Sequence, residues 1–323
     1  MIDVRRLRLL LELSRRGTIT AVADALSYTP SAVSQQLAAL EREAGAPLLE
    51  RAGRRVVLTP AGAILTRYAE SVLAVLEEAS AALAATRTSL AGPLRIGAFP
   101  TAARTILPPA LVALGRDHPD LELMVTELDP VAVPDAVRGG ALDVALTFAY
   151  DYVPAEPDPA LDTEALLEET VYLASATGAQ GAVTWAQGAV TGAQGAAETC
   201  ILDWRDAPWI AGSPDTLCHA MVVRACQACG FTPRIRHHAD DFATVLALVA
   251  AGQGVSLVPR LAVTGTPPGV RLTPLAARRR SRIACRRGTR DHPAISAFAA
   301  AIREQSLLLA LPARPYQRRG RSM

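Results

Sequence analysis

The sequence predicts an α/β protein with an N-terminal winged helix-turn-helix, a long linker helix and a larger α/β body. Three observations predict this fold class. Two short amphipathic segments flank a tight turn within residues 21–40, a long helical pattern follows over residues 60–89, and strands alternate with helices from residue 92 onward. Such alternation predicts a sheet covered by helices. A chain of 323 residues, half of them apolar, can bury two or three cores.

Charge is distributed unevenly along the chain. The net charge of +2 is the sum of +3 over residues 1–60, −12 over residues 61–270 and +11 over residues 271–323. A basic head on an acidic middle fits a small DNA-binding module attached to a body that does not bind DNA. The Arg-rich C-terminal part offers either additional nonspecific DNA affinity or a solvated strand edge and a frayed terminus, and we favour the second interpretation.

Residues 21–40 form the predicted helix-turn-helix. Apolar side chains repeat at helical spacing in both segments, as Val22, Ala23 and Leu26 and then as Val33, Leu37 and Leu40. Thr29 can cap the second helix, and Pro30 suits its first position because the N–H that proline lacks would be unpaired there. The outward side of this helix is expected to enter a DNA major groove. The expected DNA contacts are Thr29, Pro30, Ser31, Ala32, Ser34 and Gln35.

The segments around this motif complete the predicted head. Residues 4–15 form a supporting helix that ends at Gly17, and residues 49–58 form a two-stranded wing. The wing carries arginines that would lie over phosphates or the minor groove, where they supply charge but little base information. These arginines are Arg51, Arg54 and Arg55. The alternative interpretation is a solvated basic loop.

The long helix over residues 60–89 carries an apolar stripe with alternating spacings of three and four residues. A stripe of this length must be buried, and a second copy of the same helix would bury it. The residues expected to form this dimer seam are Leu65, Tyr68, Val72, Val75 and Ala79. The alternative is that the helix packs against its own body.

Residues 1–90 resemble the DNA-binding head of the LysR-type transcriptional regulators. The resemblance rests on an ordered series of segments at residues 6–8, 17–26, 30–37, 40–51 and 58–62. The sequence departs from the family at Leu7 and Leu10, in a helix that is often more aromatic, and at Gln35, where many members carry Arg. Gln35 either weakens one phosphate contact or reads an adenine edge.

The resemblance implies that the rest of the chain is an effector-binding domain of two subdomains resembling periplasmic binding proteins. The implied bounds are residues 1–59 for the winged helix-turn-helix, 60–89 for the linker helix and 92–323 for the effector-binding domain. Within the effector-binding domain, subdomain I spans about 92–162 and 269–306, subdomain II spans about 163–268, and a tail follows at 307–323. It also implies a regulator rather than an enzyme. The implied partners are double-stranded DNA, a small effector, other copies of the chain in a homodimer or homotetramer, and RNA polymerase.

The pattern in the body allows this arrangement. Strands are expected at residues 94–98, 121–127, 142–147, 170–174, 209–210, 234–237, 254–259, 270–272 and 282–285, with helices at about 102–116, 133–138, 217–229, 241–251 and 293–305. Alternation of strands and helices predicts a parallel sheet. The chain is expected to cross between the subdomains near Asp162 and again after residue 259.

The expected effector site lies beyond the carboxyl ends of the strands, near helix N-termini whose free N–H groups favour an anion. The candidate contacts are Phe99, Pro100, Thr101, Asp129, Thr147, Phe148, Ser213 and Thr216, with Asp240, Asp241 and Phe242 on the facing side. Thr101 leads this set because, in the resembled family, a hydroxyl after the first strand of this domain often meets a carboxylate effector. For each residue, capping or wall packing is the alternative.

Other chemistry is less well supported by the sequence. Cys226 and Cys229 have the spacing of half a zinc site or a redox pair, but two buried thiols one helical turn apart are the favoured interpretation. A thiol-dependent hydrolase is the alternative function, built from Cys218, His219, His237, His238, Asp240 and Asp241. Neither a phosphate-binding glycine loop nor a dinucleotide fingerprint is present, so no cofactor and no metal are expected.

The ends and one repeat complete the sequence-based expectations. The N-terminus lacks the apolar core of a signal peptide, and the longest uncharged run, residues 170–197, is too polar for a bilayer. We therefore expect a cytoplasmic protein without membrane contact. Residues 178–198 hold a seven-residue Gly-Ala-Gln unit three times, which predicts an elongated surface loop to which we assign no function.

Overall fold

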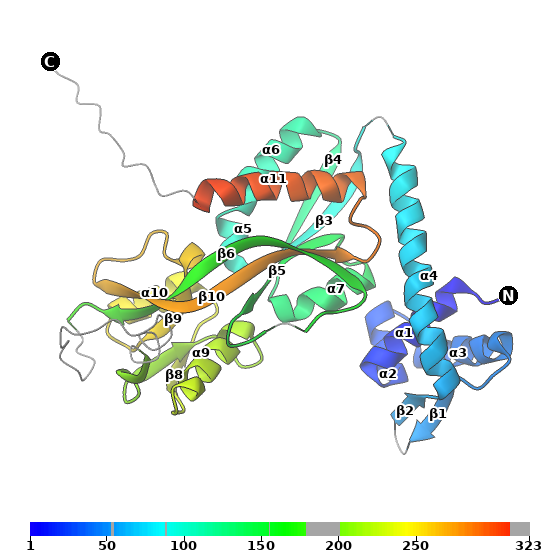
Figure 1. Cartoon of the computed structure of the whole chain (residues 1–323), viewed down its shortest axis with the longest axis horizontal. Helices are drawn as coiled ribbons and strands as arrows, with labels where there is room; N and C mark the ends of the chain where they lie inside the picture. Colours follow the sequence, from blue (N-terminus) through cyan, green and yellow to red (C-terminus); the bar gives the residue numbers. More distant parts are fainter. Residues whose placement is uncertain (53–54, 88, 155, 179–200, 311–323) are drawn as a thin grey trace.

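The computed structural model describes residues 1–52, 55–87, 89–154, 156–178 and 201–310. The head consists of α1 (Val4–Arg16), α2 (Ile19–Leu26), α3 (Pro30–Ala44), β1 (Leu49–Ala52) and β2 (Arg55–Leu58), followed by the long helix α4 (Pro60–Ala85). Figure 1 shows α4 as a straight rod between the head and the body. Most of the Gly-Ala-Gln repeat and the C-terminal tail lie outside the described residues.

The caps and the core of the head follow from its sequence. The Thr29 hydroxyl accepts a hydrogen bond from the Ala32 N–H at 3.2 Å, and Pro30 occupies the first turn of α3. Gly17 ends α1 at a φ of 71°, a conformation in which glycine has no steric penalty. The core between the three helices is fully buried and contains Leu10, Val22, Ala23, Val33, Leu37 and Leu40.

The body is built on a six-stranded sheet in the order β4-β3-β5-β10-β6-β9. Its strands are β3 (Gly92–Ala98), β4 (Leu121–Glu127), β5 (Val144–Tyr150), β6 (Leu161–Ala176), β9 (Ser256–Pro259) and β10 (Val270–Arg286). The helices of the first subdomain are α5 (Pro100–Arg104), α6 (Leu107–Asp117), α7 (Val133–Gly139) and α11 (Pro293–Ala310). The second subdomain adds β7 (Pro208–Ala211), α9 (Leu217–Ala228), β8 (Arg234–His238) and α10 (Phe242–Ala250).

The two longest strands connect the subdomains. One end of β10 pairs with β5 of the first subdomain, and β6 pairs along β10 and then with β9 of the second subdomain. In Figure 1 both strands run through the middle of the body, from under α11 to the side of α10. The chain therefore crosses twice between the subdomains without leaving the sheet.

The expectation of a parallel sheet is correct only in part. β4, β3 and β5 are parallel, but β10 is antiparallel to both of its neighbours and β9 is antiparallel to β6. The two strands expected at residues 270–272 and 282–285 are one continuous strand. Between these two segments the strand continues through an Arg-rich run, in which charged side chains obscure the alternation of apolar and polar residues. Every second residue of this stretch is buried, namely Leu275, Ala277, Arg279 and Ser281.

Two further features differ from the sequence-based expectation. The helix expected over residues 102–116 is divided into α5 and α6, because Pro108 and Pro109 at the start of α6 lack the N–H groups that a continuous helix needs. The Arg-rich run at residues 278–282 is not a solvated edge, since β10 is an interior strand of the sheet and Arg279 is fully buried.

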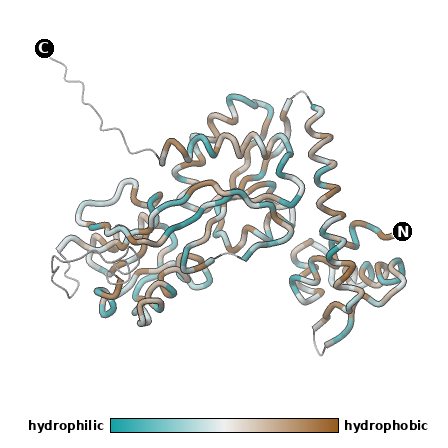
Figure 2. Tube along the Cα trace, in the orientation of Figure 1, coloured by the Kyte–Doolittle hydropathy of each residue, from teal (hydrophilic) through white to brown (hydrophobic). Residues whose placement is uncertain are grey.

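The hydropathy of α4 shows that this helix exposes apolar residues. Figure 2 shows hydrophobic residues recurring along α4 where it stands clear of the sheet. No helix in the described part of the chain is long and apolar enough to cross a membrane.

Candidate DNA-binding surface and effector site

The outward face of α3 is polar and open. Ser31, Ser34 and Gln35 are exposed together with the cap residue Thr29, whereas Ala32 is half-buried. The Ser34 hydroxyl donates to the Pro30 carbonyl at 3.0 Å, and the hydroxyls of Thr29 and Ser31 lie 3.1 Å apart. These contacts fix the side chains near the N-terminal turn, where a recognition helix meets base edges.

The predicted wing is present as an antiparallel pair. Leu49 pairs with Leu58, and Arg51 pairs with Val56. Arg51 is exposed on this ribbon. Arg54, at the predicted tip, lies outside the described residues, and only the backbone of Arg55 is described.

One side of α4 is apolar and uncovered. Tyr68, Val72 and Val75 from the predicted seam are 66%, 40% and 60% exposed, and Ala79 is exposed as well. Leu65 differs, because it is half-buried and packs against the head core. Three further exposed apolar residues of α4, which the sequence analysis did not place in the seam, are Ile64, Leu76 and Leu83. The head covers one part of α4, and the body, through the ion pair of Arg286 with Glu77 at 3.0 Å, covers another.

A cavity of about 290 Å³ lies between the two subdomains. Six of the predicted effector contacts line it, namely Phe99, Pro100, Thr101, Asp129, Phe148 and Thr216, together with Asp240 and Phe242 from the facing side. Thr147 does not line it, because successive side chains of β5 point to opposite faces of the sheet. Ser213 also lies outside the lining, although its N–H and hydroxyl both donate to Asp240 at 2.7 Å.

The central residue of the cavity floor, Arg279, is not among the contacts predicted from the sequence. The guanidinium of Arg279 donates to the Glu169 carboxylate and to the Thr101 hydroxyl, each at 3.0 Å. Its Cζ atom also lies 4.9 Å from the ring centroids of both Phe99 and Phe148. Strand register produces this cluster, since Arg279 pairs with Glu169 on β6 and with Tyr150 on β5. The period-two burial of β10 is the signal that could have separated Arg279 from its exposed neighbours.

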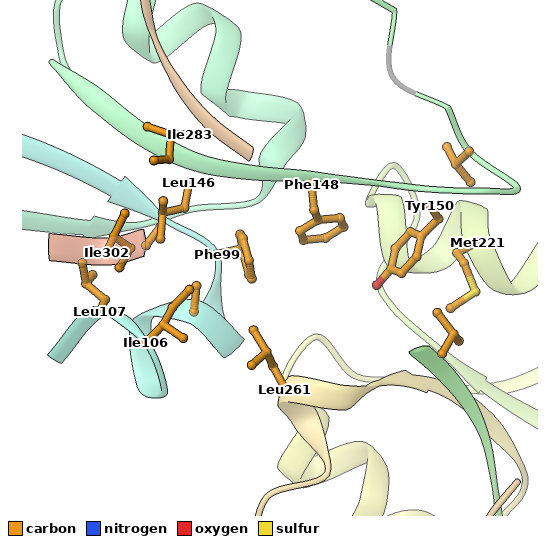
Figure 3. Close-up of a cluster of buried hydrophobic side chains, with 14 of the residues drawn as sticks. Phe99, Ile106, Leu107, Leu146, Phe148, Tyr150, Met221, Leu261, Ile283 and Ile302 are labelled. Carbon is orange, nitrogen blue, oxygen red and sulfur yellow. The ribbon is translucent and has the colours of Figure 1, made fainter. Parts of the chain in front are cut away.

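Thr101 therefore lines the cavity, but its hydroxyl is buried and already hydrogen-bonded. Its side chain is 2% exposed and accepts the Arg279 hydrogen bond. In Figure 3 the rings of Phe99, Phe148 and Tyr150 follow one another along this floor, with Phe148 and Tyr150 on the same strand. Phe99 and Phe148 meet edge to face at 4.9 Å. The floor is thus a packed aromatic layer around one ion pair.

Cys218 also lines the cavity, with its Sγ atom 3.7 Å from the Tyr150 hydroxyl. Burial raises the pKa of the Cys218 thiol to about 11, against the lowering effect of that hydrogen bond. The hydrogen-bond partner of the Cys218 thiol among the described residues is Tyr150 and not an imidazole, and the Nδ1 atoms of His219 and His238 both lie within hydrogen-bond distance of the Gly212 carbonyl. A nucleophilic thiol needs a lowered pKa or an adjacent base, so the geometry does not favour a hydrolase.

Cys226, one of the other cysteine pair, is held as a thiol, whereas Cys229 is half-buried rather than buried as the sequence suggests. Cys226 is buried in α9, and burial raises the pKa of its thiol to about 12, with a further increase from Cys229. Among the residues that the structure describes, no group of three or more His, Cys, Asp or Glu side chains could hold a metal ion.

Family models match both parts of the chain. The model described as "Bacterial regulatory helix-turn-helix protein, lysR family" matches residues 4–63, and "LysR substrate binding domain" matches residues 87–307, more than half of the chain. The chain belongs to the LysR family. It is a DNA-binding transcriptional regulator with an effector-binding domain, and the family comprises regulators rather than enzymes.

Relatives of this LysR-family chain cover most of its length. It is 31% identical over 293 residues to the "Probable hydrogen peroxide-inducible genes activator" of Streptomyces viridosporus, a match that covers 87% of each chain. It is 26% identical over 271 residues to the "Transcriptional dual regulator GltC" of Bacillus subtilis, covering 82% of this chain and 83% of the relative. The solved structure "Corynebacterium glutamicum OxyR C206 mutant" matches with a TM-score of 0.54 at 26% identity, covering 96% of this chain and 95% of the other.

Proposed function

We propose that two copies of this regulator bind an interrupted palindrome, each placing α3 in a major groove and the β1–β2 wing over the phosphates. The exposed hydroxyls and amide on α3 support this arrangement, because Ser, Thr and Gln side chains hydrogen-bond base edges. Arginines on the wing would supply charge and register. The residues assigned to DNA are Thr29, Pro30, Ser31, Ala32, Ser34, Gln35, Arg51, Arg54 and Arg55.

The observation that carries this proposal is the apolar stripe on α4. Tyr68, Val75 and Leu83 are 60–71% exposed in one chain, which is a costly arrangement in water for large apolar side chains. A second α4 would cover the stripe and hold the two heads at a fixed separation. Pairs of such dimers would form the tetramer.

Replacing Val72 and Val75 by Asp tests the dimer. We expect the double variant to sediment as a monomer and to lose most of its affinity for a two-half-site duplex, because paired charges would be buried at the seam. Arg67→Gln changes an exposed α4 residue that we do not assign to the seam and serves as the matched control. A dimer with unchanged sedimentation would refute the seam.

We propose that the effector occupies the cavity between the subdomains and changes their relative orientation. Residues of both subdomains line the cavity, including Thr101 on one side and Thr216 on the other, which supports this site. A ligand that binds one orientation better than the other shifts the population toward it. The separation of the two heads, and with it the bend of the DNA, would change accordingly. The regulator would act in the cytoplasm, where it would meet RNA polymerase.

Hydrogen peroxide is named in the titles of some relatives, but it is not the effector that this cavity favours. A cysteine reacts with oxidants as the thiolate. Among the described residues, Cys218 is the thiol that lines the cavity, and burial raises its pKa to about 11. We therefore propose a bound small molecule rather than an oxidised thiol as the signal.

Footprinting tests the proposed function most broadly. Purified protein is incubated with the DNA upstream of its own coding region, with random duplex as competitor at moderate salt. We expect protection of two half-sites on one face of the duplex, and changed protection when the effector is added. Protection that random competitor removes entirely would contradict the proposal.

A further inference from the structure

The cavity between the subdomains is rich in carboxylates. Glu127 and Asp129 line it from the end of β4 and the turn after it, and Asp240 lines it from the opposite subdomain. Burial raises the pKa of Asp129, and the charge of Asp240 raises it further, against the lowering effect of the Val131 N–H. The two carboxylates therefore repel one another across a shared space.

The arginines at this site do not offset these charges. Arg279, on the floor, is fully buried and bound to Glu169 at 3.0 Å, so the two form a neutral pair. Arg104, on α5, is bound to Asp241 at 3.1 Å. An anion in the cavity would meet the three lining carboxylates, with the one lining guanidinium already paired.

Two longer helices that begin at the cavity, α9 and α10, are already capped by side chains, whereas the short helix α5 has no side-chain cap. The Thr216 hydroxyl accepts from the His219 N–H at 3.2 Å at the start of α9, and Asp241 accepts from the Thr244 N–H at 3.2 Å at the start of α10. Asp129 accepts from the Val131 N–H at 2.9 Å. At α9, α10 and the turn after Asp129, the N–H groups named here are thus bound to oxygens of this chain itself and not available to a carboxylate ligand.

An independent feature indicates that the cavity takes a polar occupant. Within the described part of the chain, Arg279, which lines the cavity, has a buried Nε atom without a hydrogen-bond partner. Glu169 Oε2 and Ser281 Oγ are likewise buried without a partner. Arg279 and Ser281 are two residues apart on β10 and face the same side of the sheet, and Glu169 pairs with Arg279. Buried polar atoms of this kind need a hydrogen-bonding partner. Phe242 contributes an aromatic wall beside the acidic residues.

The geometry points to a small organic cation, a protonated amine that also carries an uncharged polar or aromatic group, as the effector. This inference rests on the proposed function only for the location of the effector. It replaces the carboxylate effector that the sequence resemblance implies. The amine would lie between Asp129 and Asp240 and relieve their repulsion when the subdomains close around it.

Calorimetric titration of the full-length protein with three ligands of the same skeleton tests the inference. Benzylamine, benzyl alcohol and benzoate differ mainly in charge, so their order of affinity reports the electrostatics of the cavity. We expect benzylamine to bind at least about tenfold more tightly than benzoate, a difference that one charge pair at intermediate dielectric supplies. The inference is overturned if benzoate binds more tightly, or if benzylamine binds no better than benzyl alcohol.

Variants locate the binding. Asp129→Asn and Asp240→Asn each keep one oxygen that can accept the backbone N–H of Val131 or of Ser213. Each is expected to weaken benzylamine binding about fivefold, roughly one charge pair, and to leave benzyl alcohol unchanged. Asp117→Asn, at an exposed site on α6 outside the cavity lining, is the matched control and is expected to bind benzylamine like the unaltered protein. Equal losses in all three variants would contradict the assignment.

A parallel DNA-binding measurement separates this inference from the proposed function. A protein that protects its half-sites but shows no preference for the amine has the proposed function and a different effector class. A protein that prefers the amine but protects no DNA would overturn the proposed function instead.

Discussion

Two buried charged side chains, Arg279 and Glu12, lie in different regions and are held in different ways. Arg279 is fully buried in the cavity floor, between strands whose register fixes its partners. Glu12 is 4% exposed on α1, at the junction between the head and the body. It lies 2.8 Å from Arg16 and 3.6 Å from Arg15 of its own helix, and 3.9 Å from Arg138 of α7.

The difference separates a rigid site from an adjustable one. The ion-pair partner of Arg279, Glu169, lies on the neighbouring strand of the same sheet, where strand pairing fixes it. At the junction, Arg16 also binds Asp135 at 3.2 Å and Arg8 donates to the Arg138 carbonyl at 2.7 Å, so several weak links cross from head to body. Many shared, partly solvated ion pairs can be exchanged at small cost. We infer that the effector domain holds its floor fixed and changes at the junction.

The largest expected effect is at the floor. Arg279→Met removes the only cation beside Glu169 that the described residues show within a salt-bridge distance and leaves that carboxylate buried. We expect a loss of about 3–5 kcal/mol in the free energy of unfolding, measured by urea denaturation. Replacing Glu169 by Leu in the same chain is expected to recover part of the loss, because no buried charge then remains unpaired.

Arg280→Met is the matched control for that prediction. Arg280 is the next residue on β10, is half-exposed, and is paired with Asp151 and Glu168. Its loss is expected to cost less than about 1 kcal/mol. Similar costs at the two positions would show that Arg279 does not hold the floor.

The second expected effect concerns the Cys218 thiol above the same floor. With a pKa of about 11, its thiolate fraction at pH 8 is roughly one in a thousand, against about a quarter for an unperturbed thiol. Because the pKa is raised, alkylation by iodoacetamide is expected to accelerate about tenfold per pH unit from pH 8 up to about 11. Peptide mass spectrometry after labelling measures the rate. A rate that levels off below pH 9 would contradict the buried, protonated thiol.

The smallest effect is expected at the junction. Glu12→Gln removes a charge shared by three arginines, and we expect docking of the head to weaken by about 1 kcal/mol. The rate of amide hydrogen exchange in α1 and α7 would then rise about fivefold. This increase in rate would be larger at low salt than at high salt. Glu43→Gln is the control, since its bridge to Arg6 lies within the head. Faster amide exchange of α7 in the control would show that Glu12 has no specific role in docking the head on the body.

Local patterns predicted the head better than the body. Thr29 and Pro30 specify the start of α3, and Gly17 specifies the end of α1, because each acts on the residues next to it. The cavity floor depends instead on the pairing of Arg279 with Glu169, 110 residues earlier in the chain. Arg278 and Arg280 carry the same side chain as Arg279, so only the period-two alternation of the strand separates Arg279 from them. The acidic lining likewise depends on Asp240 approaching Asp129 from the other subdomain.

The central claim is that α3 reads bases whereas the wing supplies charge, and one comparison of variants tests it directly. Affinity for the protected duplex and for random duplex is measured at several salt concentrations for Gln35→Ala and for Arg54→Gln with Arg55→Gln. We expect Gln35→Ala to lower the ratio of the two affinities by about 1–3 kcal/mol. We expect the Arg variant to weaken both affinities alike and to reduce the salt dependence by about two charges. The same change in both variants would contradict the division of roles.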